Sequence, residues 1–279
     1  MALLRRVRHL ADRLSPGLAR FYRQRRDLIL AAVERPSVTE YGFTLWHDVD
    51  GIARSRSNSG EAAVVMEAVS HADLFVDVGA NIGFFTCMAA NRGCPVIAME
   101  PHPLNLRCLY RNVADNNFAN VEIFPIAVAE RPGICDLFGG GQGASLLKGW
   151  AGIGATYVTK VPTNTLDNLL AGRPVERPVI KVDTEGNELA VLKGARRTLA
   201  RSPKPVWFIE IGLTENFPED LNPYFREIFE MMWASGYQAF TVPDSRKVRE
   251  TDVGRWISNK RRDFGSVDFV FRDETATVP

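Results

Sequence analysis

Short apolar runs alternate with amphipathic stretches along the chain from residue 74 onward. A short apolar run suits a buried strand, whereas apolar positions three and four residues apart suit a helix that packs on a sheet. The first part of this alternation predicts strand 74–78, helix 82–91, strand 95–99, helix 103–116 and strand 121–126. This order of elements is typical of an α/β fold built on a doubly wound, parallel sheet.

The alternation pauses after Ala127 and then resumes. Two strands, Gly133–Phe138 and Ala155–Val161, are predicted on either side of the loop GGGQGASLLKGWAGIG. Beyond them the pattern predicts strand 179–183, helix 188–200, strand 205–211, helix 221–235, strand 237–242 and a final strand 267–271. The glycine-rich loop lacks the G-K-[ST] ending that places a lysine on a phosphate, so a nucleotide triphosphate site is disfavoured. We interpret this loop as a mobile cover over the crevice, with Ser145 and Trp150 near the bound ligands.

The first 33 residues carry eight arginines against two aspartates. Their leucines and aromatic residues form an apolar stripe that is broken at Ser15-Pro16-Gly17, which predicts two short amphipathic helices. Three roles stay open for these basic helices: packing on the domain, formation of a homodimer, and peripheral contact with an anionic membrane. No nucleic acid partner is expected, because the arginines are distant in sequence from the candidate site.

The segment VTEYGFTLWHDVDGIARSRSNSG follows this extension and predicts two short strands around Asp48–Gly51. Trp46 and His47 are candidates for substrate contact, although an isolated histidine in a hairpin also serves structural roles. We therefore divide the chain into an N-terminal basic helical extension with a hairpin, residues 1–60, and an α/β domain, residues 61–279.

Composition adds the expected cellular setting. The 279 residues are 46% hydrophobic, and the net charge of +1 gives no reason to expect a polyanionic partner. The four cysteines lack C-x-x-C spacing, so neither a zinc site nor a disulfide framework is expected. No apolar run approaches the roughly 18 residues of a membrane span, and the start lacks the apolar core of a secretory signal. We expect a cytoplasmic protein that is at most peripheral to a membrane.

The most informative motif is LFVDVGANIG, in which an apolar strand leads to an acid and then to a glycine-bounded turn. A dinucleotide fingerprint has a middle glycine that lets the backbone approach a pyrophosphate, but here Asn81 stands between Gly79 and Gly83. Asp77 lies before the turn, where a carboxylate at the end of a central strand compensates a positively charged ligand. S-adenosylmethionine carries an ammonium and a sulfonium but no phosphate, so it suits this turn better than a dinucleotide.

A second acid ends the next strand. The run PVIAME places Glu100 roughly 20 residues after the turn, as expected for a side chain that binds two ribose hydroxyls. The cofactor-binding candidates are thus Asp77, Gly79, Asn81, Gly83 and Glu100. His102 follows at the same edge and is a candidate to stack near an adenine, while Asn105 either caps the next helix or contacts the cofactor.

Three blocks together are more specific than any one motif: VDVGANIGFF, MEPHPLNLRCLYRNVADN and IKVDTEGNELAVLKGA. They resemble the FkbM family of S-adenosylmethionine-dependent methyltransferases. The resemblance covers about Phe75–Val242, and one departure is Asn187, where many relatives have histidine.

The resemblance implies a Rossmann-like class I methyltransferase fold. Such a fold has a seven-stranded, mostly parallel sheet with helices on both faces, and its last strand inserts antiparallel; YQAFTV and VDFVF are the candidate antiparallel pair. It also implies O-methyl transfer and, by analogy with the wider superfamily, a contact between the adenine and Ala127.

The late block contributes further acids. Asp183 ends an apolar strand, and Glu185 follows before the chain turns into a helix. If the acceptor is a hydroxyl, its proton must leave, and a general base within hydrogen-bond reach is expected. Asp183 is the leading catalytic candidate, with Glu185 and Glu210 in support.

Other roles remain open for these acids. Glu185 also suits a helix N-terminal acid stabilised by the macrodipole, and Glu210 suits a paired acid below the site. Three acids around one pocket could also hold a divalent metal, as in some sugar methyltransferases of related fold, so metal dependence stays open.

The predicted function is S-adenosylmethionine-dependent methylation of a hydroxyl on a sugar, glycolipid or secondary metabolite. The expected partner is therefore a small-molecule or glycan acceptor. Two alternatives remain: a non-catalytic adaptor with a methyltransferase fold, and a nicotinamide-dependent oxidoreductase, which the missing middle glycine disfavours.

Overall fold

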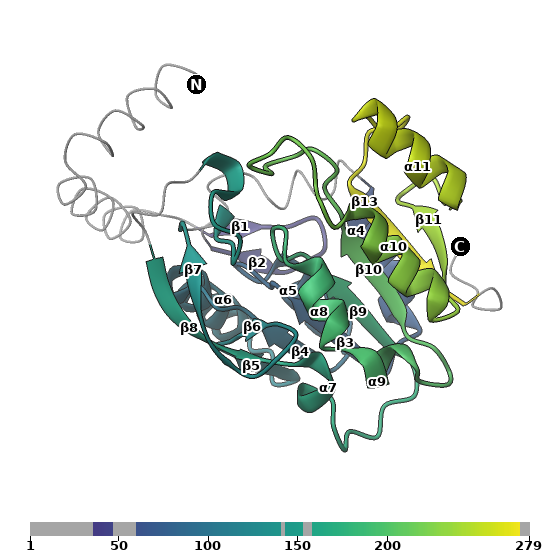
Figure 1. Cartoon of the computed structure of the whole chain (residues 1–279). Helices are drawn as coiled ribbons and strands as arrows, with labels where there is room; N and C mark the ends of the chain where they lie inside the picture. The colour runs from purple at the N-terminus through teal and green to yellow at the C-terminus, as the bar shows by residue number, and fades with distance from the viewer. Residues whose placement is uncertain (1–35, 47–59, 141–142, 153–157, 274–279) are drawn as a thin grey trace, which may run out of the picture.

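The computed structural model describes residues 36–46, 60–140, 143–152 and 158–273 (Figure 1). The predicted helices within residues 1–33, the residues Asp48–Gly51 around which two short strands were predicted, and the candidate His47 lie outside these ranges. The described part of the N-terminal extension contains a short hairpin, in which β1 (Ser37–Val38) pairs antiparallel with β2 (Thr44–Leu45).

An eight-stranded sheet runs through the centre of the described molecule (Figure 1). In spatial order its strands are β12 (Lys247–Val248), β11 (Gln238–Thr241), β13 (Asp268–Arg272), β10 (Val206–Glu210), β9 (Pro178–Val182), β3 (Leu74–Val78), β4 (Val96–Met99) and β5 (Val121–Phe124). The strands from β10 to β5 are parallel, whereas β13 runs antiparallel to both β10 and β11. The predicted antiparallel pairing of YQAFTV with VDFVF is therefore confirmed.

The sheet has one strand more than the seven that were predicted. The additional strand is β12, which pairs with β11 at the edge of the sheet. Two residues are too few for a periodic pattern to be recognised in a sequence, and only pairing with β11 makes this segment a strand.

The strand order opens a crevice beside β3. The chain leaves β3 toward β4 and leaves β9 toward β10, although β3 and β9 are neighbours in the sheet. The connections that follow these two strands therefore diverge. In open α/β sheets, ligands bind at such a point, outside the carboxyl ends of the strands.

Alternate residues of each strand serve two separate cores, because successive side chains point to opposite faces. Val76 and Ile180 join a core with the helices of one face, whereas Phe75 and Val179 join a second core with the helices of the other. Asp77 has the parity of Phe75. Its carboxylate therefore lies on the face of the second core.

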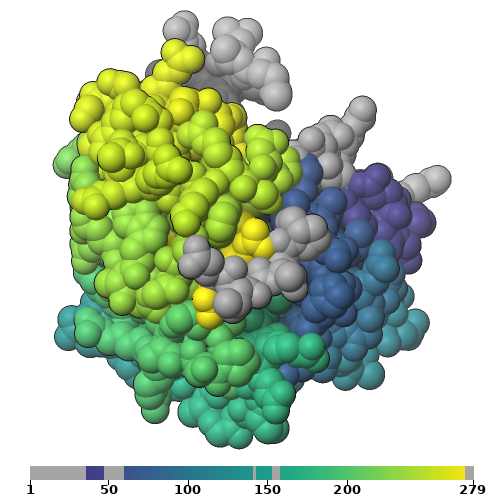
Figure 2. All heavy atoms as spheres, turned by 90° about the vertical axis from the view of Figure 1, so that its right-hand side faces the viewer, coloured from purple at the N-terminus to yellow at the C-terminus, as the bar shows by residue number. Residues whose placement is uncertain are grey.

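Helices cover both faces of the sheet (Figure 1). One face carries α4 (Glu61–Ser70), α5 (Phe84–Asn91) and α6 (Pro103–Asp115). The other face carries α7 (Leu166–Leu169), α8 (Glu188–Lys193), α9 (Arg196–Leu199), α10 (Phe225–Ala234) and α11 (Glu250–Asn259). Figure 2 shows that the yellow-green C-terminal region and the blue α4 region share one side of the molecule, although they are far apart in sequence.

Several helical segments differ from the predictions, and α4 and α7 lie where no helix was predicted. The predicted helix 188–200 is divided into α8 and α9, and Asp167 accepts hydrogen bonds from the amides of Arg197 and Thr198 at the start of α9. Helix α11 lies in a region for which no helix was predicted, and Asp252 caps it by accepting from the Arg249 amide at 3.0 Å. No helix in the described ranges is long and apolar enough to cross a membrane.

A small sheet lies beside the main one, in the order β6 (Ala127–Val128), β8 (Val158–Asn164), β7 (Gly133–Phe138). Strand β7 has the predicted bounds and pairs antiparallel with β8. Strand β8 ends three residues later than the predicted strand 155–161, whose first residues lie outside the described ranges. The loop between these strands reaches back toward the main sheet.

Candidate functional site

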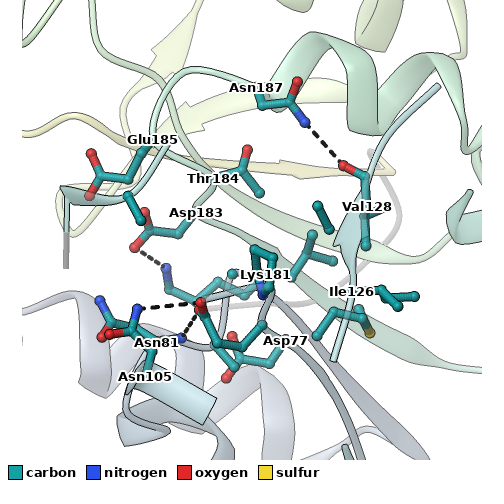
Figure 3. A pocket seen from close by; sticks show the side chains of 18 of the residues that line it. Asp77, Asn81, Asn105, Ile126, Val128, Lys181, Asp183, Thr184, Glu185 and Asn187 are labelled. Carbon is teal, nitrogen blue, oxygen red and sulfur yellow. Dashed lines mark hydrogen bonds and ion pairs between the residues drawn. The ribbon is translucent and has the colours of Figure 1, made fainter. Parts of the chain in front are cut away.

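A cavity of about 250 Å³ lies at the carboxyl ends of β3, β4 and β9 (Figure 3). It coincides with the crevice expected from the strand order. Its polar lining comes from Asp77, Asn81, Glu100, Asn105, Lys181, Asp183, Thr184, Glu185 and Asn187.

Asp77 is buried at the end of β3, with 2% of its surface exposed. Thr86, from the first turns of α5, donates its hydroxyl hydrogen to Oδ2 of Asp77 at 2.6 Å. Burial raises the pKa of Asp77 to about 6, although the nearby Lys181 ammonium opposes this rise. A cationic ligand in the cavity would favour the ionised form of Asp77.

The turn after β3 brings the backbone close to β9. Gly79 has φ +86°, and a Cβ at this position would lie 1.9 Å from the carbonyl oxygen of Asp183. Asn81 also has a positive φ of 54°, a conformation in which asparagine is enriched among non-glycine residues. The turn is therefore compatible with Gly79 but not with a larger residue at that position.

Glu100 follows β4 and is held by three donors. Its Oε2 accepts from the Asn81 amide at 2.8 Å, and its Oε1 accepts from the His102 amide at 2.7 Å and the Asn105 side chain at 3.3 Å. Only 4% of the residue is exposed, and burial raises the pKa of Glu100 to about 7. The amide donors oppose this rise, so the carboxylate is orientated but easily protonated.

Gly83 and His102 are close to this pair of acids but do not line the cavity. Gly83 precedes α5 with φ +93°, and a Cβ there would lie 2.5 Å from Leu109. His102 is the N-cap residue of α6, and its buried ring lies near Gly140. These two candidates therefore support the turn and the helix start, respectively, in this structure.

Asp183 lies at the end of β9 and lines the cavity (Figure 3). Its Oδ2 accepts from Nζ of Lys181 at 3.1 Å, and the same Nζ lies 3.5 Å from Oε1 of Glu61 on α4. Lys181 pairs directly with Asp77 in the register of β3 and β9. The leading catalytic candidate is thus linked to two further carboxylates through one buried lysine.

Glu185 is held by the loop between β7 and β8. Trp150 donates its indole hydrogen to Oε2 of Glu185 at 2.8 Å, and Ser145 donates its hydroxyl hydrogen to the Glu185 carbonyl at 2.6 Å. Glu185 has φ +54°, which is uncommon for a residue with a side chain and often marks a functional segment. Ala144 and Leu146 of the same loop line the cavity.

Glu210 is not brought to the main cavity. It lies at the end of β10 and lines a neighbouring hollow of about 20 Å³, together with Glu185 and Trp150. Asp183 does not line this hollow, so the three predicted acids do not surround one space. Within the described ranges, no group of three or more His, Cys, Asp or Glu residues is arranged to hold a metal ion.

Ala127 and Val128 line the side of the cavity opposite the turn, with Ile126 before them. Asn187 donates its amide hydrogen to the Val128 carbonyl at 3.0 Å. This contact links the start of α8 to β6. The apolar wall suits a flat, uncharged group such as an adenine ring.

Lys181 and Thr86 were missed by the sequence analysis, although both touch a candidate acid. The signal for Lys181 was available, since a lysine inside the apolar run PVIKV contradicts the expectation for a central parallel strand. Thr86 had no such signal, because a threonine in an apolar helix is common.

Comparisons with known proteins identify the family of the chain. The family model named Methyltransferase FkbM domain matches residues 77–239. The chain is also similar to the hexuronic acid methyltransferase AglP of Haloferax volcanii, with 29% identity over 178 residues that cover 60% of this chain and 72% of AglP.

Among solved structures, the chain is similar to the methyltransferase FkbM from Methylobacillus flagellatus KT, with 20% identity and a TM-score of 0.42. That match covers 72% of this chain but only 43% of the other protein. Cofactor-bound Rv0187 from MTB matches with 18% identity and a TM-score of 0.43, over 94% of this chain and 93% of that protein. Because these TM-scores are low, the match to the family model carries the assignment.

Proposed function

The chain belongs to the FkbM methyltransferase family, and from this premise we propose that it transfers a methyl group from S-adenosylmethionine to a hydroxyl oxygen of a sugar or glycan. The observation that carries the choice of cofactor is the pair of buried acids, Asp77 and Glu100, at adjacent strand ends beside a turn with Asn81 at its middle position.

The residues of the cavity fit this cofactor. Asn81 Oδ1 is buried and has no hydrogen-bond partner among the described residues, so a donor on a ligand would satisfy it. Asp77 supplies negative charge for a cationic ligand, and Oε2 of Glu100, which among the described residues accepts only from the Asn81 amide, supplies an acceptor for a ribose hydroxyl. The apolar wall at Ile126 and Val128 suits an adenine.

Bound S-adenosylmethionine would supply an electrophilic methyl group on a sulfonium. The protein's task is then to exclude water, to orient the acceptor hydroxyl and to accept its proton. Asp183 is our proposed general base, because it lines the cavity and Lys181 holds one of its carboxylate oxygens. Glu185 and Glu210 line the adjoining hollow, where they would accept hydrogen bonds from other hydroxyls of the acceptor.

The similarity to a hexuronic acid methyltransferase supports a sugar as the acceptor. The site also suits a polyhydroxylated molecule, because Asp183, Glu185 and Glu210 provide several acceptor oxygens within neighbouring spaces. Trp150 is buried beside Glu185 and holds that carboxylate in place.

Calorimetric titration of the full chain with S-adenosylmethionine and, separately, with NADH tests the cofactor. We expect micromolar binding of S-adenosylmethionine alone and a marked loss of affinity in Glu100→Ala. The matched control is Glu219→Ala, which removes an exposed acid outside the cavity and leaves affinity unchanged. Binding of NADH in preference would overturn the proposal and favour an oxidoreductase.

The acceptor is tested with methyl-tritiated S-adenosylmethionine and a panel of p-nitrophenyl glycosides of glucose, galactose, rhamnose and glucuronic acid. We expect label to enter at least one glycoside, with the methyl group on a hydroxyl oxygen by NMR. Amino sugars added to the panel separate oxygen from nitrogen as the acceptor atom. Cofactor binding without transfer to any glycan acceptor, including cell-derived oligosaccharides, would favour a non-catalytic adaptor.

A further inference from the structure

We infer that Lys181 is a positioning residue that holds the carboxylate of Asp183 at the cavity and is itself braced by Glu61 from helix α4. The inference rests on the proposed function, because it assigns Lys181 a task in the step that Asp183 would perform. It extends the site to an ion-pair network beneath the cavity, which reaches the helix that begins directly after the N-terminal extension.

Lys181 lies in an unusual place for a charged side chain. It is in β9, an inner strand of the parallel region, with 2% of its surface exposed, and Glu61 is equally buried. Strands that are buried on both faces normally carry branched apolar residues. Removing an ammonium and a carboxylate from water is costly, and apolar replacements of such buried pairs are often neutral or stabilising. Stability alone therefore does not explain this ion pair.

The distances around the Lys181 ammonium indicate that it positions Asp183. The Lys181 ammonium lies 3.1 Å from Asp183 Oδ2, at the cavity, and 3.5 Å from Glu61 Oε1, beneath it. A carboxylate held at one oxygen rotates less, so its other oxygen keeps a defined direction. Misplacement of a catalytic group by about 1 Å can lower the rate by about 10²-fold.

Other groups also surround Lys181. The ring of Phe85 on α5 lies with its centroid 4.6 Å from Nζ, and Asp77 pairs with Lys181 across β3 and β9. Asp183 in turn lies near Glu188 of α8, which is fully buried. The ammonium thus lies near the carboxylates of Glu61 on α4, Asp77 on β3 and Asp183 at the end of β9. Lys181 supplies positive charge to the described lining of the cavity.

Glu61 completes the bracing contact from an independent element. It is the first residue of α4, which follows Gly60 in a left-handed conformation. Its carboxylate fixes the other side of the Lys181 ammonium, so that the lysine does not follow Asp183 if the latter moves. The start of α4 and the end of β9 are thereby joined across one face of the sheet.

The test compares Lys181→Met with the double variant Glu61→Gln/Lys181→Met. The single variant leaves the carboxylate of Glu61 buried without its ammonium, and it is expected to lose stability. The double variant removes both charges and is expected to recover that stability, as neutral replacements of buried pairs do. If Lys181 positions Asp183, kcat stays about 10²-fold below the wild type in both variants, while the cofactor Kd at pH 8 is unchanged.

Recovery of wild-type kcat in the double variant would overturn the inference, because it would show that the ion pair acts through stability alone. Unchanged kcat in a folded Lys181→Met protein would do the same. The matched control is Lys193→Met, which removes a lysine that pairs with Glu227 on the far side of the sheet. We expect normal kcat from this control.

Cofactor binding provides a readout that does not depend on turnover. The Lys181 ammonium lowers the pKa of Asp77 against the effect of burial, so its removal moves the protonation of Asp77 to higher pH. Calorimetry on the single and double variants should show cofactor affinity falling at a higher pH than in the wild type. Wild-type protein that neither binds S-adenosylmethionine nor turns over would overturn the proposed function and this inference together. Measurement of the wild type before the variants therefore distinguishes failure of the proposed function from failure of this inference.

Discussion

The two halves of the cavity are built in different ways. On the β3–β4 side, Asp77 and Glu100 end adjacent strands, and backbone amides of the following turns hold Glu100. On the β9 side, Trp150 from the loop after β7 holds Glu185, and Lys181, which holds Asp183 from within β9, is itself paired with Glu61 of α4. One half thus depends on local backbone geometry, whereas the other depends on tertiary contacts.

This difference suggests a division of tasks. A half built from strand ends and a tight turn is fixed by its own backbone and suits a ligand that is the same throughout a family. A half held by a long loop changes with the loop, and such segments commonly carry specificity. We therefore expect substitutions on the β3–β4 side to change cofactor binding, and substitutions on the β9 side to change turnover.

The largest difference between the effect on kcat and the effect on cofactor Kd is expected from Asp183→Asn. Loss of a general base typically lowers kcat by roughly 10²–10⁴-fold, because the acceptor proton has no destination during transfer. The cofactor Kd should stay near the wild-type value, since Asp77 and Glu100 are intact. The measurements are tritium transfer to the glycoside and calorimetry, with Asp136→Asn on β7 as the control. A large change in cofactor Kd with normal kcat would contradict the assignment of turnover to the β9 side of the cavity.

Gly79→Ala tests the close contact between the turn after β3 and the backbone at the end of β9. A Cβ at Gly79 meets the Asp183 carbonyl at 1.9 Å, and the positive φ is unfavourable for alanine. We expect a loss of about 2–5 kcal/mol in the free energy of unfolding, from backbone strain and overpacking together. Urea denaturation measures it.

The matched control for Gly79→Ala is Gly93→Ala. Gly93 has a similar φ of +79°, but nothing lies within 4 Å of its Cβ position. This control should lose only the cost of the left-handed backbone, about 1–2 kcal/mol. Equal losses at both positions would mean that the turn moves away from β9 without cost.

The affinity for S-adenosylmethionine should depend on pH through the β3–β4 half. The pKa of Glu100 is raised to about 7 by burial, and its ionised form is the better acceptor for ribose hydroxyls. Affinity should be highest above pH 8 and fall by up to about tenfold per unit below pH 7. Asp77, with a pKa of about 6, steepens the fall below pH 6. Calorimetry at several pH values measures this, and Glu100→Gln should remove the step near pH 7.

The stability of the ligand-free protein should change in the opposite direction. Because the pKa values of Asp77 and Glu100 are raised on folding, the folded state binds more protons than the unfolded state between about pH 4 and pH 7. These two groups therefore stabilise the fold most at low pH, and their contribution is lost as pH rises through 6 and 7. A smaller decrease between pH 5 and pH 8 in Glu100→Gln, measured by urea denaturation, checks the sign.

The smallest effect is expected from Trp150→Phe. This substitution removes the indole donor to Glu185 but keeps an aromatic ring beside Phe217. A hydrogen bond to a charged group contributes about 1.5–3 kcal/mol, part of which the acceptor recovers from water. We expect a several-fold decrease in kcat or increase in the KM of the glycoside, with unchanged cofactor Kd.

The control for Trp150→Phe is Trp256→Phe. Trp256 also donates its indole hydrogen to a carboxylate, that of Asp263 at 2.8 Å, but it lies outside the cavity. This control should lower the thermal midpoint without a change in kcat. Equal kinetic effects of the two substitutions would indicate that Trp150 acts only through stability.

The strand ends were the most predictable part of the protein. The run LFVDV coincides with β3, and its one acid, Asp77, faces the cavity because parallel strands end at one edge. The segment Gly133–Phe138 likewise coincides with β7. Periodicity did not predict β12 or α11, because the first is defined only by its partner strand and the second begins with a polar cap.

The candidate site was predictable only in part. Glu210 ends its strand as expected, yet it lines the neighbouring hollow, because β10 is one strand farther from the switch point than β9. Lys181 was visible in the sequence as a lysine in an apolar run, but its partner Glu61 is 120 residues away. Only the packing of α4 on β9 brings the two charges together.

The sequence by itself determined most strands of the main sheet, the glycine-bounded turn and the acids at the strand ends, because these depend on side-chain periodicity and on local backbone conformation. The tertiary structure decided which of those acids share a cavity, which loop holds Glu185 and how Lys181 is braced. These outcomes depend on contacts between residues far apart in the chain, and a linear pattern contains no information on their distances.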